Sequence, residues 1–140
     1  MPTTTATLSL VNDVASVPVN ISASFNLLKA ASSEGMDEMK SVRKVLKSTN
    51  QVDLIVDATA ATAGHSFVYI SNASTVSTDF ITVTLGAAAG ASTEVIVEQI
   101  GRLYAGDWMF IPWNGVDDTG DIIVKPNTAN EMPIEFILIV

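Results

Sequence analysis

Strict alternation between apolar and polar residues is the feature that most constrains how this chain can fold. Over Val17–Leu28 the sequence reads VPVNISASFNLL, in which apolar residues take every second position and asparagine or serine takes most of the others. A repeat of two residues is that of a β-strand, whose successive side chains point to opposite faces. The pattern predicts a long strand with one buried face, and Pro18 near its beginning favours a strand start or an edge position.

The composition favours strands along the whole chain. Valine, isoleucine and threonine supply 16, 12 and 14 residues, so 42 of the 140 residues are β-branched. Such side chains are stiff and pack well on a pleated surface. Hydrophobic residues reach 48% while aromatic residues make up only 6%, so small and branched aliphatic side chains carry the apolar content.

Strand signals recur at short spacing, with turn residues between them. Many short strands separated by turns are typical of a β-sandwich or a barrel. We therefore expect an all-β fold, an antiparallel β-sandwich of eight or nine strands resembling a jelly-roll. It would form a single domain over residues 1–140, with a possible N-terminal arm at residues 1–16. Besides Val17–Leu28, the expected strands are Ala6–Leu10, Gln51–Ala58, Ser66–Asn72, Asp79–Leu85, Thr93–Leu103, Trp108–Trp113, Asp121–Lys125 and Pro133–Val140.

One segment, Ala30–Lys47, does not follow the strand pattern. As a helix it would carry Asp37 and Glu38 early and its lysines late, an arrangement that suits the helix macrodipole. As an extended segment it alternates poorly. A short helix and an irregular basic loop, within residues 30–50, are therefore two open alternatives.

Charge is divided unevenly along the chain, whose formal net charge is -8 and whose pI is about 4.3. Residues 1–47 hold five basic and four acidic side chains, whereas residues 48–140 hold two basic and eleven acidic ones. A basic cluster is ordinarily a solvated face. Its functional interpretation is a docking patch for an acidic neighbour, such as the acidic part of another copy. The members of the cluster are Lys40, Arg43, Lys44 and Lys47.

Several classes of protein are excluded by what the sequence lacks. Without cysteine there is no disulfide framework or thiolate metal site, and one histidine cannot form a multi-histidine metal cluster. The acidic balance argues against nucleic acid as a partner. We expect no membrane partner, because no apolar run approaches the roughly 20 residues that span a bilayer and no signal-peptide pattern is seen.

Two polar features could carry chemistry, and both have a plainer explanation. His65 begins an expected strand and has no partners at the spacing of a catalytic triad, so a surface or partly buried histidine is expected. Asp117, Asp118 and Asp121 surround a glycine, as carboxylates do in calcium loops, but they lack the spacing of an EF-hand. A β-turn is the favoured interpretation. We expect no cofactor, no metal and no enzymatic activity.

An aromatic group forms the other candidate surface, and its members are Tyr104, Trp108, Phe110 and Trp113. A strand over Trp108–Trp113 places Trp108 and Phe110 on one face and Trp113 on the opposite face. That geometry opposes a flat sugar-stacking platform. It favours one buried tryptophan and one tryptophan at a turn or an interface.

The absence of catalytic constellations and the high apolar content together indicate a structural protein. The polar faces of the expected strands carry mostly threonine, serine and asparagine, which are uncharged. A weakly charged β-protein with this much apolar content has surface to hide, and self-assembly hides it. We therefore expect a homo-oligomer.

Two stretches of the sequence resemble small virion structural proteins of tailed bacteriophages, especially those of cyanophages. They are Glu98–Gly115, EQIGRLYAGDWMFIPWNG, and the closing strand PIEFILIV. The opening SLVNDV, with its long alternating strand and basic segment, is similar too. The resemblance covers about two-thirds of the chain and rests on structural motifs. A function inferred from it is therefore inferred by analogy.

This resemblance implies a capsid decoration (cement) protein that binds between capsomers as a homo-oligomer, commonly a trimer. It implies the major capsid protein or another virion protein as partner, and the capsid surface as location after synthesis in the host cytoplasm. Trp108–Trp113 and its turns would then bury against a neighbour, and Lys40–Lys47 would meet an acidic surface. Tail, neck or fibre-associated proteins are alternatives, as is a carbohydrate- or receptor-binding module.

Overall fold

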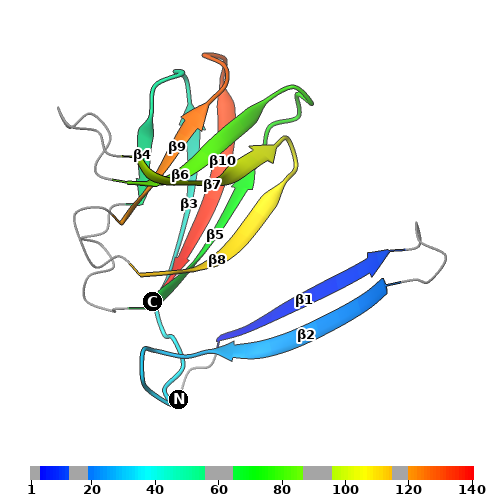
Figure 1. Ribbon diagram of the computed structural model, residues 1–140, viewed down its shortest axis with the longest axis vertical. Helices are drawn as coiled ribbons and strands as arrows, with labels where there is room; N and C mark the ends of the chain where they lie inside the picture. The colour runs from blue at the N-terminus through cyan, green and yellow to red at the C-terminus, as the bar shows by residue number, and fades with distance from the viewer. Residues whose placement is uncertain (1–3, 13–18, 56–64, 87–95, 115–119) are drawn as a thin grey trace. The chain divides into compact units, whose positions relative to one another are not determined.

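Ten antiparallel strands form the regular structure of the residues described by the computed structural model, which are 4–12, 19–55, 65–86, 96–114 and 120–140 (Figure 1). No helix occurs in these ranges, so the expected all-β class is confirmed. The same ranges therefore contain no membrane-spanning helix. The strands are β1 (Thr4–Asn12), β2 (Val19–Leu27), β3 (Met39–Leu46), β4 (Val52–Ile55), β5 (Ser66–Asn72), β6 (Phe80–Gly86), β7 (Ile96–Tyr104), β8 (Trp108–Trp113), β9 (Asp121–Pro126) and β10 (Met132–Ile139).

The chain divides into two compact units, Met1–Glu38 and Met39–Val140. The first unit holds a two-stranded sheet made of β1 and β2, and the second holds all the other strands. A single domain over residues 1–140, with an arm at residues 1–16, stays a prediction.

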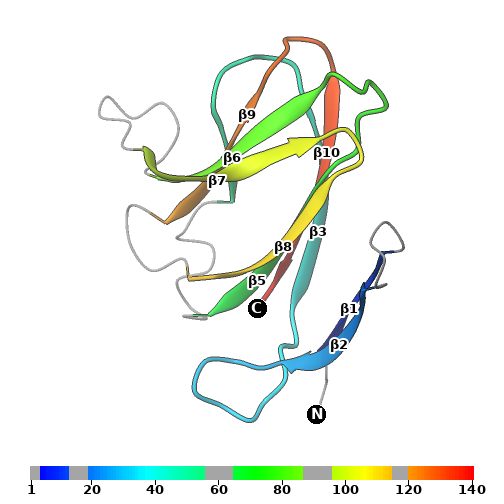
Figure 2. The same cartoon turned by 45° about the vertical axis from the view of Figure 1, so that its right-hand side comes forward.

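The eight strands of the second unit form two four-stranded sheets, β3-β10-β5-β8 and β4-β9-β6-β7, and Figure 2 shows the two layers. Along the chain, each of four antiparallel pairs is enclosed by the pair before it, as in one long hairpin. From the outermost to the innermost, these pairs are β3–β10, β4–β9, β5–β8 and β6–β7. The pairs β10–β5 and β9–β6 form where that hairpin is rolled up. This is the connectivity of a jelly-roll. The expected fold is confirmed: the described residues hold ten strands, and eight of them form the sandwich, for which eight or nine were expected.

The core lies between these two sheets. It consists of the side chains that point inward, which are every second residue along a strand such as β5. In β5 the side chains of Val68 and Ile70 are fully buried, while their neighbours along the strand are only half-buried. Burial of each such side chain contributes about 1.5–3 kcal/mol relative to exposure. The other fully buried aliphatic side chains of this core are Ile81, Val83, Ile122, Val124 and Ile134.

Strand β3 corrects the expectation for Ala30–Lys47, because the second half of that segment is neither a helix nor a loop. β3 pairs with β10 along its whole length. It is an edge strand whose side chains stay exposed or half-buried on both faces until Leu46 enters the core, so it lacks the alternation of a half-buried strand. Residues 29–38 before it do form turns and irregular chain.

The hairpin of β1 and β2 corrects a second expectation. Both strands were predicted, and they pair in register from Thr4 opposite Leu27 to Asn12 opposite Val19. The predicted buried face is wrong, because every side chain of residues 20–26 is exposed and only Leu27 of the described β2 side chains is buried. A face is buried when a second layer packs on it, and the described residues of this unit contain no second sheet.

Candidate interaction surfaces

The outer face of the β3-β10-β5-β8 sheet carries many large apolar residues beside the exposed Arg43–Glu135 pair, although the outer faces of sandwiches normally carry mostly polar residues. Residues directly opposite each other on paired strands share a face, so the register identifies its members. Trp108 and Met39 are 54% and 64% exposed. We call this surface the aromatic face, and its large apolar members are Met39, Val45, Phe67, Tyr69, Trp108, Phe110, Ile137 and the buried Ile139.

Two stacked pairs of rings define the centre of the aromatic face. Phe67 and Phe110 stack with centroids 5.4 Å apart and planes 5° apart, and Tyr69 and Trp108 stack at 6.0 Å and 30°. Each ring of a pair therefore packs in an offset stack against the other ring. His65 lies edge-on to Phe67 at 4.9 Å, which accords with the partly buried histidine expected from the sequence.

The sequence reasoning missed Phe67 and Tyr69. A signal was present, because the two aromatic residues alternate with Val68 and Ile70 in SFVYISN. With the aliphatic residues in the core, the aromatic residues must point outward.

The predicted opposite orientations of the two tryptophans, one of them buried, are confirmed. Trp108 and Phe110 lie on the outer face of β8, whereas Trp113 points into the core and is only 4% exposed. The indole Nε1 of Trp113 donates a 2.7 Å hydrogen bond to the carbonyl oxygen of Gly120. Trp113 is thus a core residue of its own sandwich, while an interface role for Trp108 and Phe110 stays a prediction.

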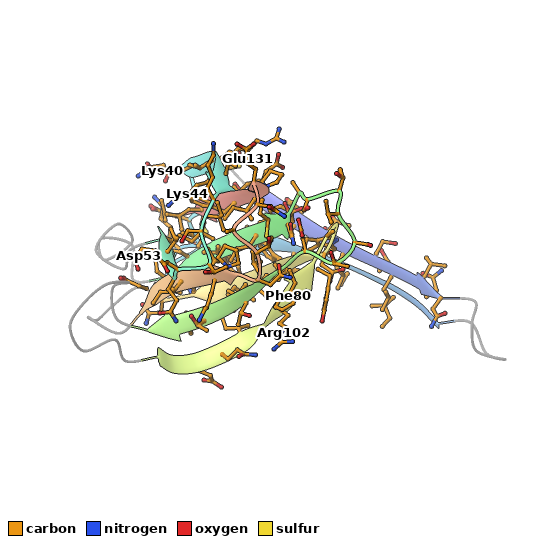
Figure 3. All side chains as sticks on the ribbon, turned by 90° about the horizontal axis from the view of Figure 1, so that it is seen from above. Lys40, Lys44, Asp53, Phe80, Arg102 and Glu131 are labelled. Atoms are coloured by element: carbon orange, nitrogen blue, oxygen red, sulfur yellow. The ribbon has the colours of Figure 1, made fainter. Side chains whose placement is uncertain are left out.

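Tyr104 is not part of the aromatic face, because it lies on β7 in the other sheet. Its ring packs against Phe80 at 5.3 Å, and the guanidinium group of Arg102 lies 4.7 Å from the centroid of the Phe80 ring (Figure 3). The four aromatic residues singled out from the sequence therefore occupy three places: the aromatic face, the core and the β6–β7 surface.

The tight turn between β7 and β8 presents Trp108, and the backbone of Asn72 holds this turn. Gly106 adopts a φ of 85°, a conformation that glycine tolerates best, and its N–H donates to the carbonyl of Asn72. The N–H of Asn72 in turn donates to the carbonyl of Asp107. The start of β8 is thereby fixed to the end of β5.

Lys40, Arg43 and Lys44 lie on edge strand β3, Lys47 directly follows it, and these basic residues have partners within the chain. Lys47 forms an ion pair with Glu131 at 2.7 Å, and Arg43 lies 3.7 Å from Glu135. Lys44 donates to the carbonyl oxygen of Asp53 at 3.3 Å (Figure 3). The hydrogen bond from Lys47, together with its charge, lowers the pKa of Glu131.

These contacts neutralise part of the predicted docking patch. By strand alternation Lys40 and Lys44 also belong to the opposite face of β3 from Arg43, so the four cations do not form one surface. Their role in docking to an acidic neighbour stays a prediction.

No metal-binding arrangement is found in the part of the chain that the structure describes. No group of three or more His, Asp or Glu residues is placed there to hold a metal ion. Asp117 and Asp118 lie outside the described residues. Asp121, which begins β9, is buried and lies opposite Gly86 of β6.

The hairpin presents a second apolar surface, on one side of its two strands. Leu10 is 50% exposed and Phe25 is 45% exposed. We call this side the apolar face of the hairpin, and its members are the directly opposed pairs Ala6–Phe25, Leu8–Ala23 and Leu10–Ile21.

The other side of the hairpin is uncharged and, apart from Val11, polar. Thr5 donates to the side-chain oxygen of Asn26 at 3.0 Å, and the hydroxyls of Thr7 and Ser24 are 3.2 Å apart. Neither strand contains a charged residue. The chemistry available here is therefore side-chain packing and backbone hydrogen bonding.

No family model and no curated protein sequence matches the chain. Among solved structures the chain is similar to the Yersinia pseudotuberculosis-derived mitogen, with a TM-score of 0.45 and 13% identity over 74% of this chain and 86% of that one. It is also similar to a protein of Bacillus endospore appendages, which form disulfide-linked pili, with a TM-score of 0.48 and 14% identity over 81% of this chain and 94% of that one.

These similarities concern the small β-sandwich and carry no argument about function. The resemblance to bacteriophage virion proteins rests on the sequence motifs alone and stays a prediction.

Proposed function

We propose that this protein is a structural subunit, without enzymatic activity, that assembles with further copies of itself. The observation that carries the proposal is the exposed apolar face of the hairpin. Leu8, Leu10, Ile21 and Phe25 are each between 44% and 50% exposed on one side of an uncharged two-stranded sheet.

Such a hairpin is poorly suited to isolation in water. An isolated two-stranded sheet is marginally stable, and it needs further strands or a packed face to be stable. Burial of the exposed apolar residues against a neighbour would supply the missing layer. Each large side chain that becomes fully buried contributes about 1.5–3 kcal/mol.

The aromatic face supports the same proposal independently of the hairpin. Contiguous exposed apolar patches are rare on monomeric soluble proteins and mark interaction sites. Trp108 and Met39 lie on this face, and tryptophan and methionine are both enriched at protein interfaces.

The finer proposal is that the assembly is the virion of a tailed bacteriophage, with this chain as a capsid decoration protein at the capsid surface. The motifs of Glu98–Gly115 and the closing strand support it by resemblance. Its partners would be further copies, as a trimer, and the major capsid protein. A tail, neck or fibre location is the alternative within the same proposal.

The native mass of the purified protein tests self-assembly, and size-exclusion chromatography with light scattering measures it. We expect an oligomer, and we expect Phe25→Ser to weaken it by about tenfold or more, because a buried aromatic anchor is lost. Val76→Ser is the matched control, since Val76 is a 53% exposed loop residue of the sandwich unit. A monomer at every concentration would contradict the proposal. An oligomer of unchanged mass for Phe25→Ser would place the contact between copies away from the apolar face of the hairpin.

Binding to undecorated phage shells tests the finer proposal. Co-sedimentation with shells would support the decoration role, and binding only to tails or necks would assign the alternative location. An oligomer that binds no part of the particle would leave the structural role standing and remove the virion role.

A further inference from the structure

The edges of the two jelly-roll sheets are protected against pairing with foreign strands. Edge β3 carries Lys40, Arg43 and Lys44, and edge β8 contains Pro112, which offers no N–H group. Edge β4 is only four residues long, and edge β7 pairs with β6 through two register irregularities. Charges, proline, short length and bulges are the usual means by which proteins block edge-to-edge pairing.

The hairpin has none of these protections. β1 and β2 are nine residues each, pair without a register shift, and contain no charged residue and no proline. Among the described residues each strand has only the other as its sheet neighbour, apart from a bridge between Leu28 and Gly35 just beyond the end of β2. Among the described residues, the outer edges of β1 and β2 therefore pair with no further strand, although the carbonyl of Leu27 in β2 accepts the N–H of Met36. The edges of both jelly-roll sheets are protected.

We infer that the hairpin is a strand-addition element: an open edge of one copy's hairpin pairs with the hairpin of a second copy and extends its sheet. This inference rests on the proposed self-assembly and specifies its geometry. The backbone N–H and C=O groups that point away from the β1–β2 pair supply the new hydrogen bonds. In an antiparallel pair these groups belong to alternate residues.

The distribution of charge favours a second copy of this chain as the partner that pairs with the hairpin edge. The chain carries a net charge of -8, so copies repel each other, but the two hairpin strands carry no charge and can meet at little electrostatic cost. An acidic or basic partner would find no complementary group on these strands. A second hairpin offers a matching apolar face and a matching polar face.

The same alternation restricts the register of the intermolecular pairing. A slip by one residue would place the apolar face of one hairpin beside the polar face of the next. Registers that join Leu8 and Phe25 with the apolar residues of the other copy are therefore favoured, and they continue one apolar surface across the joined sheet.

Amide hydrogen exchange, measured residue by residue on the full chain at concentrations above and below assembly, tests this inference. In the assembled protein we expect the outward-pointing amides of the pairing strand to exchange at least about tenfold more slowly than in the dissociated protein. Packing of side chains alone would leave alternate amides in rapid exchange. The amides of Ile70 and Val124 in the sandwich report that the fold is intact.

Thr7→Lys and Ser24→Lys, singly and together, supply the variants, because both residues are exposed on the polar side of the hairpin. A charge on an open edge opposes strand pairing, so we expect the variant at the pairing edge to raise the dissociation constant by about tenfold or more. Thr49→Lys, at an exposed bend of the sandwich unit, is the control.

The outcomes separate the inference from the function on which it rests. Slow outward amides, lost together with assembly in a hairpin variant but not in Thr49→Lys, support strand addition. An oligomer with rapid alternate amides, or with hairpin variants that assemble like the control, overturns strand addition and leaves self-assembly standing. A wild-type monomer at all concentrations overturns both.

Discussion

At the scale of single residues, the buried side chain of Asn72 joins three backbone segments by hydrogen bonds. Its Nδ2 donates to the carbonyl of Leu103 at 3.1 Å, and its Oδ1 accepts the N–H of Ser74 at 3.0 Å. The residue is 1% exposed. It therefore satisfies backbone groups of β7 and of the β5–β6 loop that water cannot reach.

Replacement of Asn72 by alanine is expected to lower the free energy of unfolding by about 2–4 kcal/mol, because buried backbone groups lose their partners. Asn114→Ala, at an exposed position after β8, should change it by less than about 0.5 kcal/mol. Urea unfolding of both variants measures the difference. Equal stability of Asn72→Ala and the wild type would show that other groups satisfy this backbone.

At the scale of elements, the pairing of β3 with β10 decides the structure of a segment that local sequence leaves ambiguous. Arg43 lies directly opposite Glu135 in this pairing, and their side chains form an exposed ion pair at 3.7 Å. Exposed pairs contribute little, typically about 0–1 kcal/mol. Because the two residues are directly opposed, changes to their charges nevertheless test the register of β3 against β10.

Arg43→Glu should lower the free energy of unfolding by about 0.5–1 kcal/mol, since it sets two like charges directly opposite each other. The double variant Arg43→Glu with Glu135→Arg should recover most of the loss. Thermal or urea unfolding of the four proteins in this cycle measures the coupling. Absence of any recovery in the double variant would argue against the β3–β10 register.

At the scale of the whole molecule, charge and assembly are coupled. The two strands of the hairpin are uncharged, while the chain as a whole carries -8. Assembly through the hairpin therefore brings like-charged copies together without a compensating charge pair at the contact. Assembly through the basic strand β3 would instead join opposite charges.

Salt should distinguish these two modes of assembly. If copies meet through the hairpin, self-association strengthens as ionic strength rises, because the screening length falls from about 30 Å at 0.01 M to about 3 Å at 1 M. If they meet through Lys40–Lys47 and an acidic surface, self-association weakens over the same range. Light scattering across a salt series measures the direction, and weaker association at high salt would favour the basic strand.

Much of the fold could be predicted from the sequence because apolar and polar residues alternate along most of the strands, and this pattern can be seen within each strand alone. β5 and β8 have the bounds expected from the sequence, and the opposite orientations of Trp108 and Trp113 follow from their odd spacing. β3 could not be predicted in this way, because an edge strand with exposed side chains on both faces carries no alternation. Only its hydrogen bonds to β10, a strand about ninety residues later in the chain, make it a strand.

The sequence by itself determined the all-β class, nine of the ten strands seen in the described residues, and the sandwich with its jelly-roll character. It could do so because β-branched content and a repeat of two residues are local features of the sequence. Only the tertiary structure decided which faces are covered. It placed Phe67 and Tyr69 with Trp108 on an outer face, gave the cations of β3 partners within the chain, and left the apolar face of the hairpin exposed. Alternation states that a strand has an apolar side, but burial depends on whether another layer is present to pack against it.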